Sequence, residues 1–307
     1  MAAVFWQNKG EAERDEMRKR RCGMLNLIVW LCILYGPVTA TAGACTFWAA
    51  AGERTENNVV LIAKNRDGRP VQSDKLAIVK EGHGYRYLGL SPLENGKKRT
   101  VSAGINEKGL AIVSASPGSG APDWREQGGG RGMVGRLLQS CAGVSEVFAK
   151  HEWLLSSQPG FYMVGDRNEI AWIEIAPGRQ FASRGRRRGV LAHANHYLHE
   201  KLAPPNAKVD EGSSKRLQRI QQLLQSYVPP LSMDDFVVFS EDRKGGPDHA
   251  IWRSGRDPLG ERTLSTWIVA LSTNDVPQLY VKIANPDEPE KVFRLSLHPA
   301  FWDSGLD

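Results

Sequence analysis

The sequence predicts an α+β fold in which layers of β-sheet are covered by helices. Segments with the composition of β-strands dominate both ends of the chain that follows residue 44, and helix-like segments lie between them. Turn-forming residues follow several of the strand-like segments at short intervals, which is typical of antiparallel hairpins. Because the sequence has no internal repeat and no low-complexity linker, residues 45–307 are predicted to form a single domain.

In the first half of this domain, strands are predicted at residues 59–63, 85–90, 100–103 and 110–115. The first of them is a β-branched run, and the turn-forming residues 65–68 (Asn-Arg-Asp-Gly) predict that it ends there. The last two form a hairpin whose turn lies at residues 106–109. Residues 116–131 are rich in Gly, Pro and Ser, which predicts a long loop.

In the second half, strands are predicted at residues 161–164, 170–175, 190–192, 263–271 and 279–283. Residues 133–155 form a helix-like region. A second helix is predicted to open at residues 213–216, with Ser213 or Ser214 as its N-cap, and to stop before the prolines at 229–230.

The first 44 residues are interpreted as an export signal. Residues 17–21 are basic, residues 24–35 are almost entirely apolar, and Ala42 and Ala44 supply the small residues that a signal peptidase requires. The core of the signal is therefore 17–44, with cleavage before Cys45 and release to the periplasm or the exterior. The apolar stretch is shorter than the roughly 20 residues that cross a bilayer, although an uncleaved membrane anchor stays an alternative.

Charge and cysteine content restrict the classes of partner. The chain carries a net charge of +6, and residues 1–44 contribute six basic and four acidic residues to it, so the exported part retains +4. This weak, dispersed charge gives no indication of nucleic-acid binding, and the densest basic run, at 184–188, is predicted to be a solvated hairpin tip. The exported chain keeps only Cys45 and Cys141, which either pair in one disulfide or leave one thiol for chemistry.

Cleavage before Cys45 would place a thiol and a free α-amine on one residue. An α-amino group titrates near ~8 and can accept the proton of the thiol, so no separate base is needed. Two alternatives stay open: Cys45 is an inert or disulfide-bonded residue, or it is lipidated. The second is disfavoured by Ala42, because a lipidation signal usually has leucine at that place.

The order of several motifs resembles a known superfamily. The motifs are Cys45-Thr46-Phe47, Asn65-Arg66-Asp67, the Gly-Ile-Asn-Glu-Lys-Gly-Leu run at 104–110, Asn195-His196-Tyr197 and Ser213-Ser214-Lys215-Arg216. Together they resemble the N-terminal-nucleophile (Ntn) hydrolases of the choloylglycine hydrolase and penicillin V acylase group, and more closely the relatives of acyl-coenzyme A:6-aminopenicillanate acyltransferase. The resemblance implies a four-layer αββα sandwich of two antiparallel sheets between helices.

The resemblance also implies roles around the nucleophile. Cys45 would attack an amide carbonyl and form a thioester, and Asp67 would hold its α-amino group. Lys64 occupies the position of an arginine that lies beside the nucleophile in the family. A cation there favours the thiolate, and either Lys64 or Arg66 could supply it, while a surface position for either residue is an open alternative.

Asn195 matches the asparagine that donates its side-chain amide to the oxyanion, and by position the second donor is the backbone N–H of Ser116. Arg216 shares a helix face with apolar residues, so we expect a buried position that needs a partner. The family places it near the catalytic centre, while a structural salt bridge, or Arg219 in the same role, is an open alternative.

The sequence predicts no cofactor and no metal site. His193 and His196 flank Asn195, but no third ligand is evident. The predicted function is hydrolysis of a linear, non-peptide C–N amide, such as a bile-salt conjugate, penicillin V or an N-acyl amino acid, through a Cys45 thioester. The partner is thus a small-molecule acyl amide, without nucleic acid or stable membrane association after cleavage, and a homo-oligomer is possible. The alternatives are an acyltransferase and a lipid-anchored, non-catalytic binding protein.

Overall fold

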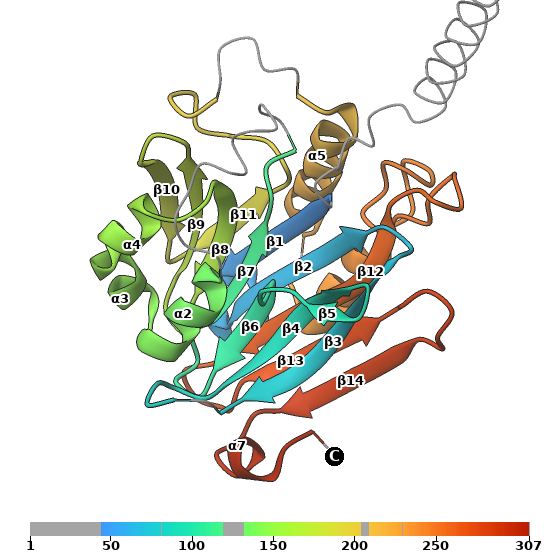
Figure 1. Ribbon diagram of the computed structural model, residues 1–307. Coiled ribbons are helices and arrows are strands. Elements are labelled where there is room, and N and C mark those ends of the chain that lie inside the picture. Colours follow the sequence, from blue (N-terminus) through green and yellow to red (C-terminus); the bar gives the residue numbers. More distant parts are fainter. Residues whose placement is uncertain (1–43, 81, 119–131, 204–208, 229, 307) are drawn as a thin grey trace, which may run out of the picture. The chain divides into compact units, whose positions relative to one another are not determined.

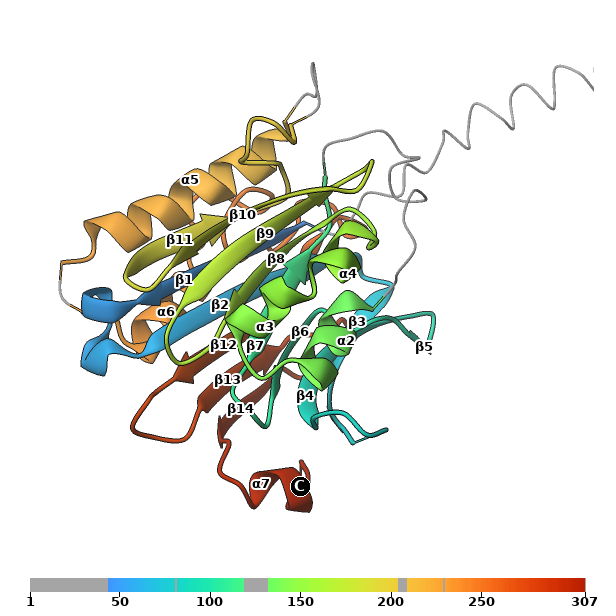
Figure 2. The same cartoon turned by 90° about the vertical axis from the view of Figure 1, so that its left-hand side faces the viewer.

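The computed structural model describes residues 44–80, 82–118, 132–203, 209–228 and 230–306. The predicted export signal and most of the predicted loop at 116–131 lie outside these ranges. Two antiparallel sheets are stacked face to face, with helices on both outer faces (Figures 1 and 2). The fold is therefore the predicted αββα sandwich.

The first sheet has six strands in the order β11-β1-β2-β12-β13-β14. Their bounds are Gly189–His193 (β11), Cys45–Ala51 (β1), Val60–Gly68 (β2), Arg262–Leu271 (β12), Gln278–Ile283 (β13) and Lys291–Ser296 (β14). The second sheet has the order β10-β9-β8-β7-β6-β4-β3, and β5 pairs with β4. Their bounds are Gln180–Arg186 (β10), Ile170–Ala176 (β9), Gly160–Gly165 (β8), Ala111–Ala115 (β7), Ala103–Asn106 (β6), Tyr87–Glu94 (β4), Gln72–Val79 (β3) and Lys97–Lys98 (β5).

Helices close the two outer faces. The longer ones are α5 (Glu211–Ser226) and α6 (Met233–Ser240), which pack on the first sheet, and α2 (Met133–Ser140), α3 (Val144–Ala149) and α4 (His151–Leu155), which pack on the second. Short helices η1 (Gly52–Arg54) and η2 (Glu56–Asn58) follow β1, and α7 (Phe301–Ser304) lies near the C-terminus. No helix among the described residues has the length and apolar character needed to cross a membrane.

Strand β1 shows how the sequence specifies the layers. Successive side chains of a strand point to opposite faces, so Cys45 and Phe47 join the core between the two sheets, while Trp48 joins the core under α5 and α6. All seven residues of β1 are buried, because both faces of the sheet are covered.

The prediction that the first strand ends at residues 65–68 is wrong. These residues continue β2, which pairs with β1 on one side and β12 on the other. The polar side chains are tolerated there because they find partners. Asn65, for example, donates to the carbonyls of Ser240 and Ile251 and accepts from Thr266. Strand pairing on both sides outweighs the local turn propensity.

Two helix predictions also need correction. The helix-like region at 133–155 is three helices rather than one, and Asn106 donates to the carbonyls of Leu138 and Cys141 where α2 ends. Helix α5 begins at Glu211, and its N-cap is Asp210 rather than a serine. The hairpins β6–β7, β8–β9 and β12–β13 are confirmed, whereas strands β1, β3, β5, β10 and β14 and helix α6 were not predicted.

Candidate active site

Cys45 begins β1, the strand next to the edge strand β11 in the first sheet, and only 6% of its surface is exposed. It pairs with Arg66 of β2, and the next inward-facing residue of β1, Phe47, pairs with Lys64. Because paired residues of antiparallel strands point to the same face, Lys64 and Arg66 project from β2 on the same side as the thiol of Cys45. Cys45 and Cys141 are both free thiols, so the predicted alternative of a disulfide between them is not formed.

The two cations beside Cys45 differ in their partners. Arg66 pairs with Asp74 at 3.1 Å and donates to Gln72 at 3.1 Å. Lys64 is 2% exposed and donates to the carbonyl oxygen of Ser102 at 3.0 Å. Since that carbonyl is neutral whereas Asp74 balances the charge of Arg66, Lys64 is the stronger electrostatic neighbour of the thiol.

Burial opposes charge on both members of the Cys45–Lys64 pair. Burial raises the pKa of the Cys45 thiol, and the charge of Lys64 acts in the opposite direction. Burial lowers the pKa of the Lys64 amine, and a charge on Cys45 acts to raise it. The two groups therefore stabilise each other in the ionised state, as thiolate and ammonium.

Asn195 connects Cys45 to Arg216. The Oδ1 atom of Asn195 accepts from the backbone N–H of Cys45 at 2.8 Å and from Nη2 of Arg216 at 3.0 Å. Two donors at one oxygen fix which end of the amide faces Cys45. Arg216 is 1% exposed and also donates from Nε to Oγ1 of Thr46 at 3.2 Å. It is thus buried and partnered beside Cys45, while Arg219 pairs with Asp242.

The other end of the Asn195 amide contacts Ser116. Nδ2 donates to the Ser116 carbonyl oxygen at 2.8 Å, so the contact of Ser116 with this network is made by its carbonyl group rather than by its N–H group. A second hydrogen bond joins the residues after β7 to Asn195: the N–H of Gly118 donates to the Asn195 carbonyl oxygen at 2.7 Å. Ser213 of α5 accepts from the Asn195 N–H at 2.8 Å.

Asp67 lies next to Cys45 through its backbone, whereas its side chain binds elsewhere. Its N–H donates to the carbonyl oxygen of Ala44 at 2.9 Å, which is the carbonyl of the peptide bond before Cys45. Its carboxylate accepts from Thr263 at 2.7 Å and pairs with Arg253 at 3.3 Å. Burial raises the pKa of Asp67, and Arg253 opposes this shift.

The two histidines that flank Asn195 are held by protein groups. His193 contacts the carbonyl oxygen of Ala194 through Nδ1 and the carboxylate of Glu174 through Nε2, each at 2.8 Å. The side chains of His193 and Glu174 are fully buried. His196 contacts Oγ of Ser213 at 2.7 Å. Among the described residues, no group of three or more His, Cys, Asp or Glu side chains is arranged to hold a metal ion.

Sequence reasoning missed two sets of contacts. Thr46, Ser213, Arg253 and Thr263 contact predicted site residues, and Glu174 contacts His193 beside Asn195. Only Glu174 carried a local signal, because it is a single acidic residue inside the otherwise apolar strand β9. The others are common polar residues whose partners lie far away in the sequence.

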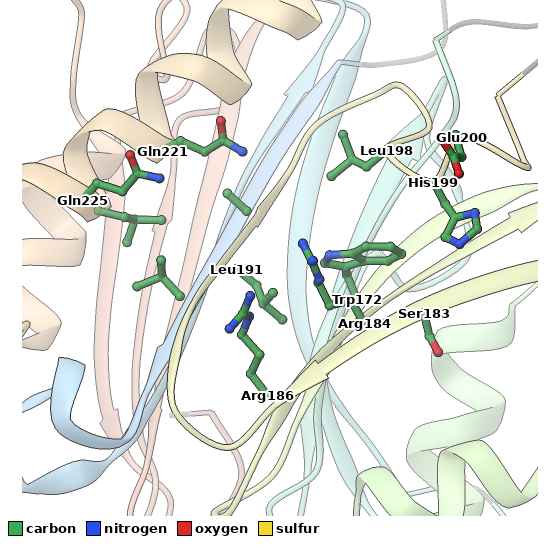
Figure 3. Close-up of a pocket in the computed structure, with 13 residues that line it drawn as sticks. Trp172, Ser183, Arg184, Arg186, Leu191, Leu198, His199, Glu200, Gln221 and Gln225 are labelled. Carbon is green, nitrogen blue, oxygen red and sulfur yellow. The ribbon is translucent and has the colours of Figure 1, made fainter.

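A pocket of about 750 Å³ lies beside this site, between β10, β11 and α5 (Figure 3). Neither Cys45 nor Lys64, Asn195 or Arg216 lines it. The ring of Trp172 in its wall lies 6.0 Å from the His193 ring, which in turn stacks on Phe47 at 5.1 Å. A layer of aromatic rings therefore separates the pocket from the inner face of β1.

The fold is the αββα sandwich of the Ntn-type acylases and acyltransferases. Residues 54–286 match the family "Acyl-coenzyme A:6-aminopenicillanic acid acyl-transferase". The match covers more than half of the chain, and the chain belongs to this family. It begins after Cys45, so Cys45 itself is not part of the matched stretch.

Two solved structures share the fold. A variant of conjugated bile acid hydrolase from Clostridium perfringens has a TM-score of 0.53 and 14% identity, over 82% of this chain and 92% of the hydrolase. Penicillin V acylase from Agrobacterium tumefaciens has a TM-score of 0.50 and 15% identity, over 82% of this chain and 86% of the acylase. No curated protein matches the sequence.

Proposed function

We propose that Cys45 is the nucleophile of an exported enzyme that cleaves the amide bond of a small N-acyl compound through a thioester. The observation that carries the proposal is the position of Cys45 at the start of β1, a strand paired on both sides. There its backbone nitrogen is bound by Asn195, and its thiol faces the buried Lys64. The nitrogen belongs to a peptide bond in the full-length chain and becomes the α-amine when residues 1–44 are removed.

In this proposal the charge of Lys64 favours the thiolate of Cys45, and the α-amine accepts the thiol proton and later passes it to the leaving amine. Asn195 holds the nitrogen of Cys45 through Oδ1, and Arg216 fixes Oδ1 from the other side. Nδ2 of Asn195, which binds the Ser116 carbonyl oxygen in this structure, is the atom that donates to the acyl oxygen of the tetrahedral intermediate and stabilises its negative charge. The thiolate attacks the acyl carbon, the amine leaves, and water then hydrolyses the thioester.

Export is part of the same proposal. Cleavage before Cys45 by the export machinery would free the α-amine, so activity would begin only after the chain has crossed the membrane. The proposal places the enzyme in the periplasm or outside the cell, without a lipid anchor.

A second candidate is acyl transfer to an amine, which the family match favours. Both reactions share the thioester and differ only in the acceptor. The test is therefore amine release from penicillin V, glycocholate and N-acyl amino acids, repeated with hydroxylamine as an added acceptor. Hydroxamate at the expense of free acid would support transfer, and free acid alone would support hydrolysis.

The nucleophile is tested by intact mass of the exported protein before and after brief exposure to iodoacetamide. We expect a chain that begins at Cys45 and takes one label at that residue. Cys141→Ala is the matched control, because Cys141 is also a buried free thiol and should not be labelled. A diacylglycerol-sized increment, or a chain that keeps residues before Cys45, would contradict the proposal and favour an anchored binding protein.

A further inference from the structure

The pocket between β10, β11 and α5 lies where the edge strands of the two sheets face each other. β11 is the outermost strand of the first sheet and β10 is the outermost strand of the second. Helix α5 crosses beside β11, and Figure 3 shows Gln221 and Gln225 of α5 on one side of the pocket, opposite Trp172 and Arg184. The hollow is therefore a product of the open side of the sandwich.

One part of the pocket wall is apolar. Trp172 of β9, Leu191 and Ala192 of β11, and Leu224 of α5 line it, and all four are largely buried. Such a wall stabilises a hydrocarbon or ring in proportion to the apolar area that leaves water. A pocket of about 750 Å³ falls in the range that holds small organic ligands.

The polar part of the wall is cationic. Arg184 and Arg186 line the pocket from the same face of β10, two residues apart, and Glu200 is the only acidic residue in the lining. Within the part of the chain that the structure describes, neither arginine forms an ion pair. Alternate residues of a strand lie about 7 Å apart, so both guanidinium groups can reach one carboxylate. An arginine fork is well suited to that group.

His199 adds a polar atom that the fold leaves without a partner. Its Nδ1 is buried and has no hydrogen-bond partner among the described residues, and His199 lines the pocket. A buried polar atom without a partner is costly in free energy. Because Nδ1 is enclosed by protein, a ligand in the pocket reaches it only if the His199 side chain turns.

We propose that this pocket binds an organic anion, a carboxylate on an apolar body, at a site separate from Cys45. The carboxylate binds Arg184 and Arg186, and the apolar body lies against Trp172, Leu191 and Leu224. The site does not depend on the reaction proposed for Cys45, because none of that reaction's residues lines the pocket.

The test is calorimetric titration of the exported protein with octanoate, with octylammonium as the cation of the same chain length. We expect saturable binding of one octanoate per chain and no binding of octylammonium. Equal binding of both ions, or no octanoate binding up to about 10 mM, which is a free energy near −3 kcal/mol, would overturn the proposal.

Two pairs of variants locate the site. R184Q/R186Q should weaken octanoate binding by about tenfold or more, since charged hydrogen bonds are lost, whereas R187Q/R188Q in the adjacent turn should not.

Gln221→Trp should block the pocket from an exposed position of α5, while Gln222→Trp, also exposed but outside the lining, should leave binding intact. Equal effects within either pair would contradict the assignment.

A final variant separates this site from the reaction site. Cys45→Ala should bind octanoate with unchanged affinity, even if the protein proves inactive on every amide. Loss of binding in Cys45→Ala, or after alkylation of Cys45, would instead assign octanoate to the acyl site and overturn the proposal.

Discussion

Lys64 and Cys45 project from neighbouring strands into the same buried space between the two sheets, and each opposes the effect of burial on the other's pKa. We therefore expect the pair to set the reactivity of the thiol near neutral pH. This relationship depends on the register of β1 against β2, which sets Lys64 opposite Phe47.

Removal of the Lys64 charge should reduce the reactivity of Cys45. In Lys64→Met we expect iodoacetamide to label Cys45 about tenfold more slowly at pH 7, because an opposite charge at this range shifts a pKa by one unit or more. The labelling-against-pH profile should move to higher pH, since less thiolate is present at each pH. Lys64→Arg keeps the charge and should stay near the wild-type rate. An unchanged profile in Lys64→Met would exclude Lys64 as the activating cation.

Asn195→Ala should separate the oxyanion role from nucleophile activation. We expect kcat for amine release, from whichever amide of the panel is cleaved, to fall by about 10²- to 10³-fold. Iodoacetamide labelling of Cys45 should change little, because alkylation forms no oxyanion. Asn168→Ala, at an exposed turn, is the control. Wild-type kcat in Asn195→Ala would refute the assigned role.

Arg216→Met should destabilise the fold by about 1–3 kcal/mol, because Thr46 and Asn195 lose a charged donor in a buried place. Urea unfolding measures this free energy. The matched change Arg219→Met removes a partly exposed pair with Asp242 and should cost about 1 kcal/mol or less. If the two variants lose the same free energy of unfolding, the buried hydrogen bonds of Arg216 contribute no more to stability than the partly exposed pair of Arg219.

Glu174→Gln tests the buried pair with His193. Both ring nitrogens of His193 face oxygen atoms, so an ionised Glu174 requires an imidazolium that donates twice. Loss of the negative charge should cost about 3 kcal/mol in urea unfolding, since a buried cation is left without its partner. Glu152→Gln, which breaks the exposed pair with Arg179, should have no measurable effect. A neutral effect of Glu174→Gln would mean that the pair is uncharged.

His196 predicts a loss of stability in mild acid. Burial lowers the pKa of His196, and neutral His196 accepts a hydrogen bond from Ser213, whose oxygen already accepts from the Asn195 N–H. The unfolded chain therefore binds a proton, near pH ~6.5, before the folded chain does. The free energy of unfolding should fall as pH drops below that value. In His196→Gln the free energy of unfolding should fall less steeply as the pH drops. An unchanged slope would mean that other groups cause the loss of stability.

Much of the fold could be predicted because its signals are local. The β-branched runs, the turn at residues 106–109 and the helical spacing in α5 each depend on neighbours in the sequence, and the structure confirms these elements. The prediction failed for residues 65–68, where local turn propensity was outweighed by two neighbouring strands.

The sequence by itself determined the candidate residues: a cysteine after a predicted export signal, a lysine and an aspartate in the next strand, and an asparagine and an arginine far along the chain. Only the tertiary structure decided their partners. It paired Asp67 with Arg253 and Arg66 with Asp74, and it placed Asn195 between Cys45 and Arg216. The reason is physical: burial, strand register and the choice of ion-pair partner depend on residues far apart in the sequence, as Asp67 and Arg253 are at 186 positions, and no local pattern encodes them.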